Sequence, residues 1–197
     1  MKLILPMRNL HAAVFGSLER LAGDWFLPLC ARTTFLAVLF FYFHNSWKTK
    51  VEGGLAGFLS VMDSAYYQIV PWAVDAAGGE ISQVGFINHA IVFLGTTAEI
   101  VLPLLIVAGL FTRAAALGMI VFIGVQSWVD INFHGVSGDT AGALFDRFSD
   151  SLVADQRTLW AFLLLVLVVK GAGAVSLDAL FSRLSGFNVA ASRPATA

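Results

Sequence analysis

Four long stretches of apolar residues constrain this chain more than any other feature. They run over 26–43, 86–110, 114–131 and 158–175, and each is close to the roughly 17–25 residues that a helix needs to cross a bilayer. The sequence is 58% hydrophobic and only 13% charged, whereas soluble domains carry about 25% charged residues. We therefore predict an all-α membrane protein, an antiparallel bundle of four transmembrane helices.

The segments between and beside these spans have weaker patterns. Residues 51–70 place apolar side chains at helical spacing and predict an amphipathic outer segment. A short apolar stripe that follows Ser176 predicts a C-terminal surface helix with that serine as N-cap. We expect an N-terminal cytoplasmic segment over 1–24, which could form a short surface helix, then a membrane domain over 25–185 and a disordered tail over 186–197.

The distribution of basic residues predicts the orientation of the chain. Seven of the twelve Lys and Arg residues lie on the side of the termini and four on the opposite side. Since cytoplasmic loops are enriched in basic residues, we expect both termini in the cytoplasm. The net charge of −1 argues against a nucleic-acid partner. The single cysteine, Cys30, excludes a disulfide or a dithiol pair within the chain.

Two charged residues lie inside the apolar stretches, where charges are costly unless they are paired. If His44 and His89 mark the outer helix ends, Arg32 and Glu99 lie roughly 18 Å and 15 Å below the same surface. We therefore predict an Arg32–Glu99 ion pair near or somewhat below the midplane. It could be a structural clasp that fixes helix register, or a site that handles protons or quinone.

Three histidines fall at predicted outer helix ends. They are His44, His89 and His134, with Asp130 and Gln126 in the same layer. Imidazole and carboxylate groups gathered at one face could bind zinc, copper or iron, or relay protons near neutral pH. They could equally be isolated interfacial histidines, because no two of them lie on one helix face.

Two further stretches carry a family resemblance. They are Thr97–Ala116, which reads TAEIVLPLLIVAGLFTRAAA, and Lys170–Asp178, which reads KGAGAVSLD. Arg32 in the first span and Lys48 just after it complete the pattern. In this order the features resemble the DoxX family of small four-helix bacterial inner-membrane proteins, over roughly 28–182.

The resemblance implies a multi-pass protein of the bacterial inner membrane. It also implies a membrane subunit of a redox system that links oxidation of thiols or sulfur compounds to the quinone pool, with a partner subunit. Arg32, Glu99 and Arg113 are the family positions that carry over. The sequence has no haem, flavin, iron–sulfur or dithiol motif, so electrons would come from a partner or from quinone directly, and whether the chain is itself an oxidoreductase stays open.

Other functions are compatible with the same residues. One is a non-catalytic membrane anchor or metal-handling accessory protein, and another is a small proton-coupled transporter, which would need a homo-oligomer. The candidate binding residues are Arg113, Lys48, Gln126 and Asp130. The candidate cofactors are a quinone and a metal ion.

Overall fold

The computed structural model describes residues 4–53, 57 and 60–184. The regular structure in this part of the chain is helical, and the one β feature there is an isolated antiparallel bridge between Val51 and Val61. Four helical segments are long and apolar enough to cross a membrane, which confirms the predicted fold class. They are Phe26–Lys48, Phe86–Ala108, Thr112–Asn132 and Leu152–Lys170.

The first span is one continuous helix with a wider turn in its middle. It consists of α2 (Phe26–Phe35), the π-helical turn η1 (Leu36–Phe40) and α3 (Phe41–Lys48). It continues five residues past the expected end at Phe43, because no glycine or proline interrupts the sequence before Lys48.

The second and third spans form a tight antiparallel hairpin. The second is α6 (Phe86–Ala108) and the third is α7 (Thr112–Asn132). Gly109 ends α6 in the left-handed region with φ 72°, a conformation in which glycine has no Cβ penalty. Pro103 lies inside α6 and lacks the N–H that would bond to the carbonyl of Glu99.

The fourth span is shorter at its C-terminal end than the apolar pattern indicates. It consists of the π-helical turn η4 (Leu152–Gln156) and α9 (Arg157–Lys170). It ends before Val175 because Gly171 and Gly173 adopt φ 77° and φ 76°. The chain then forms α10 (Leu177–Leu184), where the Ser176 hydroxyl accepts the N–H of Ala179 at 3.1 Å, so the predicted helix and its N-cap are confirmed.

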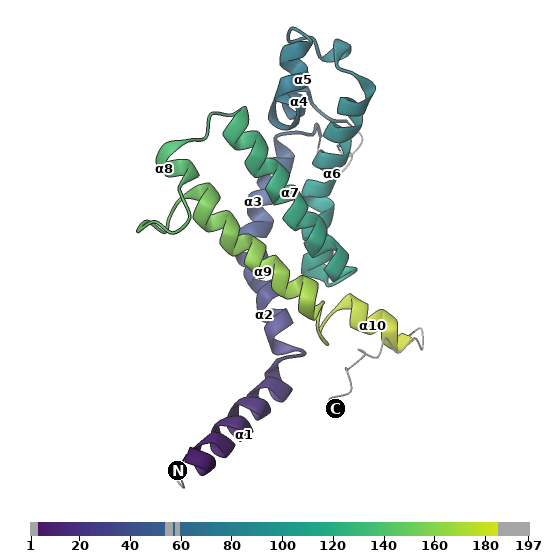
Figure 1. Ribbon diagram of the computed structural model, residues 1–197. Helices are drawn as coiled ribbons and strands as arrows, with labels where there is room; N and C mark the ends of the chain where they lie inside the picture. Colours follow the sequence, from purple (N-terminus) through teal and green to yellow (C-terminus); the bar gives the residue numbers. More distant parts are fainter. Residues whose placement is uncertain (1–3, 54–56, 58–59, 185–197) are drawn as a thin grey trace.

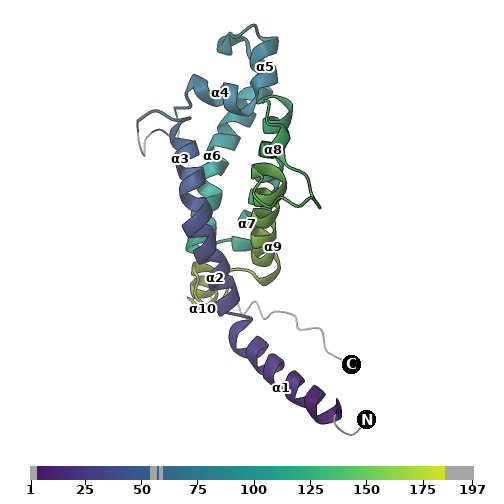
Figure 2. The ribbon, with the colours of Figure 1, turned by 90° about the vertical axis from the view of Figure 1, so that its left-hand side faces the viewer.

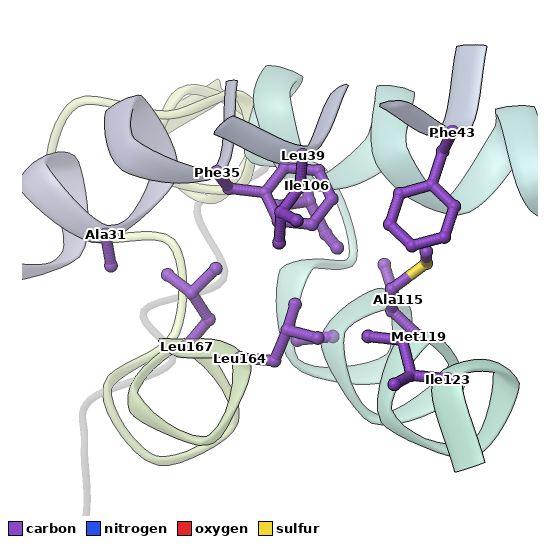
Figure 3. Close-up of a cluster of buried hydrophobic side chains, with 11 residues drawn as sticks. Ala31, Phe35, Leu39, Phe43, Ile106, Ala115, Met119, Ile123, Leu164 and Leu167 are labelled. Atoms are coloured by element: carbon purple, nitrogen blue, oxygen red, sulfur yellow. The ribbon is translucent and has the colours of Figure 1, made fainter. Parts of the chain in front are cut away.

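The four spans close into a bundle (Figures 1 and 2). The α6 helix packs against α7, α7 against α9, α9 against α2, and α3 against α6. Side chains from every span meet in a fully buried centre (Figure 3). Because lipid tails are as apolar as these side chains, the helices are held together by close packing and not by the expulsion of water. The largest of these side chains are Phe35, Leu39, Phe43, Ile106, Met119, Leu164 and Leu167.

The two ends of the bundle differ. One, here named the terminal end, has α10 and the helix α1 (Ile4–Ala22), which extends away from the spans (Figure 1). The α1 helix matches the surface helix considered for 1–24. Five of its exposed apolar side chains form one stripe: Met7, Leu10, Val14, Leu18 and Leu21.

The opposite end, here named the cap end, is covered by short helices. They are α4 (Asp63–Ile69), α5 (Pro71–Ala76), the 3₁₀ turn η3 (Ile81–Gln83) and α8 (Gly138–Ala141).

The prediction of one amphipathic segment over 51–70 is wrong for its first part. The α4 helix begins only at Asp63, because Val51 pairs with Val61 and Gly53 adopts φ 73°. Residues 54–56 and 58–59 of that segment, and the whole tail over 186–197 that was predicted to be disordered, lie outside the described residues.

Candidate functional site: a buried ion pair beside a cavity

A cavity of about 620 Å³ lies between α6 and α7, under α4. Gly95 on α6 and Gly118 on α7 border it without a side chain. Its apolar rim consists of side chains that are 41–64% exposed on the outer surface of the spans, so the cavity opens toward the lipid-facing side. These rim residues are Ile91, Leu94, Val121 and Val125.

The polar wall of the cavity holds an ion pair between Lys50 and Glu99. The ammonium Nζ lies 2.8 Å from Oε2 of the carboxylate, and the two side chains are only 6% and 3% exposed. The same Nζ donates to the carbonyl and the hydroxyl oxygen of Ser46, at 3.2 Å and 2.8 Å. A buried charge pair persists only when its remaining hydrogen bonds are also made, and Ser46 supplies them.

The local fold explains how Lys50 reaches a residue inside a span. The N–H of Lys50 bonds to the carbonyl of Trp47, and its carbonyl accepts from Met62. The side chain therefore leaves the end of the first span and runs back along it toward Ser46. Glu99 stands thirteen residues after the start of α6, or roughly 20 Å along the helix axis.

A second ion pair joins α7 to α9 at the edge of the cavity. Arg157, only 4% exposed, pairs with Asp130, and its guanidinium also donates to the Ser127 hydroxyl at 3.0 Å. Asp130 is one of the cavity-lining residues. Both carboxylates at the cavity are therefore matched by a cation, so the wall is close to neutral overall.

Amide and imidazole groups complete the polar wall. The Gln126 amide donates through Nε2 to the Tyr42 hydroxyl at 3.0 Å, while its Oε1 is buried without a hydrogen-bond partner among the described residues. His134 Nε2 lies 3.1 Å from the carbonyl oxygen of Gln68 on α4. Since that oxygen can only accept, His134 carries the proton on Nε2.

The predicted Arg32–Glu99 ion pair is wrong. Glu99 pairs with Lys50, and Arg32 donates four hydrogen bonds of 2.5–3.2 Å to backbone carbonyls at the terminal end. These carbonyls belong to the last residues of α6 and to the loop between α9 and α10. They are those of Ile106, Val107, Ala172 and Val175.

The error came from the length of the first span. Because that helix ends at Lys48 and not at Phe43, Arg32 lies close to the terminal end and not near the midplane. Ile106, which it contacts, is seven residues after Glu99, or roughly 10 Å along the axis. Carbonyls at a helix C-terminus have no partner within the helix and carry the negative end of its dipole, so a guanidinium suits them.

The predicted metal cluster of three histidines is also not formed. His89 Nδ1 lies 2.6 Å from the Tyr66 hydroxyl, His134 contacts Gln68, and His44 stacks on Phe40 with ring centroids 6.0 Å apart. Among the described residues, no group of three or more His, Cys, Asp or Glu side chains could hold a metal ion. The assumed helix ends were inexact, because His44 lies inside α3, four residues before its end at Lys48, whereas His134 follows the end of α7 at Asn132.

Of the four predicted binding residues, two lie at the cavity and two do not. Gln126 and Asp130 line the cavity, whereas Lys48 and Arg113 are exposed on the surface of the bundle.

Sequence reasoning missed Lys50, Arg157 and Gln68. Lys50 and Arg157 were counted only as charges in outer connections. Arg157 directly precedes the predicted span 158–175, close enough for a long side chain to reach back into it. Lys50 lies seven residues past the predicted end at Phe43 and gave no such signal.

Comparison of the chain with family models, with curated proteins and with solved structures gave no match. The residues of the cavity therefore carry what can be inferred about function.

Proposed function

We propose that this chain is a DoxX-like membrane subunit of a redox system that links oxidation of thiols or sulfur compounds to the quinone pool, and that it holds a quinone headgroup in the cavity between α6 and α7. The observation that carries the proposal is the buried Lys50–Glu99 pair on the wall of a cavity with an apolar, lipid-facing rim. The resemblance of Thr97–Ala116 and Lys170–Asp178 to that family supports it.

The chemistry of a quinone matches this cavity. An isoprenoid quinone has an apolar tail that stays in lipid and a ring with oxygens that need polar partners. The volume of about 620 Å³ falls within the roughly 300–1,000 Å³ of small-molecule sites. Glu99 and the nearby Asp130 are positioned to exchange protons with a bound ring, since reduction of a quinone takes up protons.

Electrons reach the site from a partner in this proposal. The chain has one cysteine, Cys30, and so cannot form an internal dithiol. A thiol-oxidising partner subunit would bind the protein, and the chain would contribute the lipid-side site. The proposal includes the bacterial inner membrane as location and cytoplasmic termini, supported by the excess of Lys and Arg on the side of the termini.

Filling the cavity tests the proposal. The full chain, purified in detergent, is titrated with decylubiquinone and decylubiquinol, and binding is compared between wild type and Ala98→Phe. Ala98 lines the cavity, so the phenyl ring should abolish binding. The matched control Ala114→Phe places the same ring on the exposed surface of α7 and should bind as wild type does.

Two results would count against the proposal. One is no binding of either quinone form by the folded wild-type chain, which would favour a non-catalytic anchor. The other is equal binding by both variants, which would place the ligand elsewhere on the protein.

A further inference from the structure

We infer that the cavity recognises the dihydroxy, reduced form of its ligand in preference to the dicarbonyl, oxidised form. The inference rests on the proposed function and specifies which quinone species the site is built for. It follows from counting the hydrogen-bond donors and acceptors that remain free on the polar wall.

The ammonium and imidazole donors that line the cavity are already engaged. A lysine ammonium has three N–H groups, and those of Lys50 face Glu99 Oε2 and both oxygens of Ser46. His134 donates its Nε2 proton to the carbonyl of Gln68. Arg157, which lies outside the cavity lining, donates through its two terminal nitrogens to Asp130 and Ser127, and its Nε is buried without a hydrogen-bond partner among the described residues.

Acceptors, in contrast, remain free. A carboxylate offers about four lone-pair sites, and the contacts of Glu99 in the described structure use one oxygen, toward Lys50. Gln126 Oε1 is buried without a hydrogen-bond partner among the described residues, because Tyr42 holds the other end of the amide. Leaving a buried acceptor unpaired costs about 1–3 kcal/mol, so the wall favours a ligand that donates.

Charge selects a neutral donor over a cation. Lys50 matches Glu99, and Arg157 matches Asp130, so an additional positive group would have no unpaired charge to face. A hydroxyl donates a proton without carrying charge, and a reduced quinone has two such hydroxyls at opposite sides of its ring. The oxidised form has carbonyl oxygens in their place, and these would face the oxygens of Glu99 and Gln126.

Preferential binding of one redox form has a thermodynamic consequence. Tighter binding of the reduced form raises the reduction potential of the bound couple by the same free energy, because the two equilibria are linked. The site would therefore make its bound quinone a better electron acceptor for a thiol-oxidising partner.

The test compares two ligand pairs on the full chain in detergent. The first pair is decylubiquinol and decylubiquinone, kept anaerobic. The second is an alkylresorcinol and its dimethyl ether, which differ in hydroxyl donors but do not interconvert by oxidation. In both pairs we expect the dihydroxy compound to bind about tenfold more tightly, which corresponds to one recovered hydrogen bond.

Gln126→Leu should lower the preference for the dihydroxy compounds severalfold, because it removes the free acceptor Oε1. The control Gln156→Leu replaces an exposed glutamine that lies outside the cavity lining and should leave the preference unchanged. Equal or tighter binding of the carbonyl and ether compounds would overturn the inference while leaving the quinone site standing. Absence of binding by all four compounds would remove the proposed function and this inference with it.

Discussion

The guanidinium of Arg32 lies directly against Gly109, such that a Cβ built on the glycine would come within 2.7 Å of Arg32 Cζ. The contact joins the first span to the turn between α6 and α7. In the same place, the carbonyl of Gly109 accepts the N–H of Asp178 at 2.8 Å. The Arg32 guanidinium therefore stabilises the terminal end of the bundle by donating hydrogen bonds to carbonyls of α6 and of the loop between α9 and α10.

Gly109→Ala should destabilise the protein for two separate reasons. The left-handed φ of 72° costs a residue with a Cβ about 1–2 kcal/mol, and the collision with Ser176 Cβ and with the Arg32 guanidinium should add about 1–3 kcal/mol. Gly78→Ala is the matched control, because Gly78 has φ 64° and no atom within 4 Å of a built Cβ. The loss of stability of both variants is measured by thermal unfolding in detergent. Equal losses would contradict the close packing of Arg32 and Ser176 against Gly109.

Arg32→Lys should destabilise the protein, because a lysine cannot replace the guanidinium at the terminal end. Four carbonyls are bonded by the planar group, and an ammonium has only three donors in a different geometry. We expect a loss of at least about 2 kcal/mol, measured by unfolding in detergent. Arg113→Lys, at an exposed arginine near the same turn, should change stability little; a similar loss there would refute the argument.

The Lys50–Glu99 pair should show strong coupling in a double-mutant cycle. Lys50→Met or Glu99→Leu alone leaves an unpaired buried charge and should cost about 3–5 kcal/mol. The double variant should be less destabilised than the sum of the two, since both charges are gone. Additive losses would mean that the two groups do not interact. Lys48→Met, at the exposed neighbour, serves as control.

Asp178→Ala should destabilise the start of α7. The carboxylate accepts the N–H groups of Phe111 and Thr112 at 2.8 Å and 3.2 Å, and loss of such a cap costs about 0.5–2 kcal/mol. Hydrogen exchange at those two amides should speed up more than elsewhere in α7. In the control Asp146→Ala, only the exposed bond to Phe148 N–H is removed, so protection in α7 should not change.

The stability of the cap end should fall at alkaline pH. Burial, and secondarily Asp63, raises the pKa of Tyr66 above its usual value of about 10. A raised folded-state pKa means that this stabilisation is complete below the unfolded pKa and is lost as pH rises through the folded one. We therefore expect unfolding midpoints to drop above about pH 10 more steeply in wild type than in Tyr66→Phe. Parallel pH profiles would contradict this.

Much of the fold could be predicted because it depends on local properties of the sequence. Long apolar runs define the four spans, since a helix alone satisfies its backbone in lipid. The N-cap at Ser176 followed from the same kind of local rule, whereas the left-handed turn at Gly109 was seen only in the structure. The fourth span ended before Val175 because Gly171 and Gly173 adopt positive φ. The prediction of a span over 158–175 was based on apolar residues alone and did not take these glycines into account.

The candidate site could be predicted only in part. Glu99, Gln126 and Asp130 were named from the sequence, and the structure places all three at one cavity. Lys50 was missed because it follows the helix that it reaches back along. The three histidines were grouped because each was assumed to mark a helix end. In the structure His44 lies inside α3, whereas His134 lies beyond the end of α7.

The sequence by itself determined that the chain forms four apolar helices with a buried acid and a buried base among them, because hydrophobicity and charge are properties of each residue. Only the tertiary structure decided that Glu99 pairs with Lys50 and that Arg32 holds backbone carbonyls. Pairing depends on helix length, on rotation about each axis and on the reach of flexible side chains, and these are fixed only when the helices pack together.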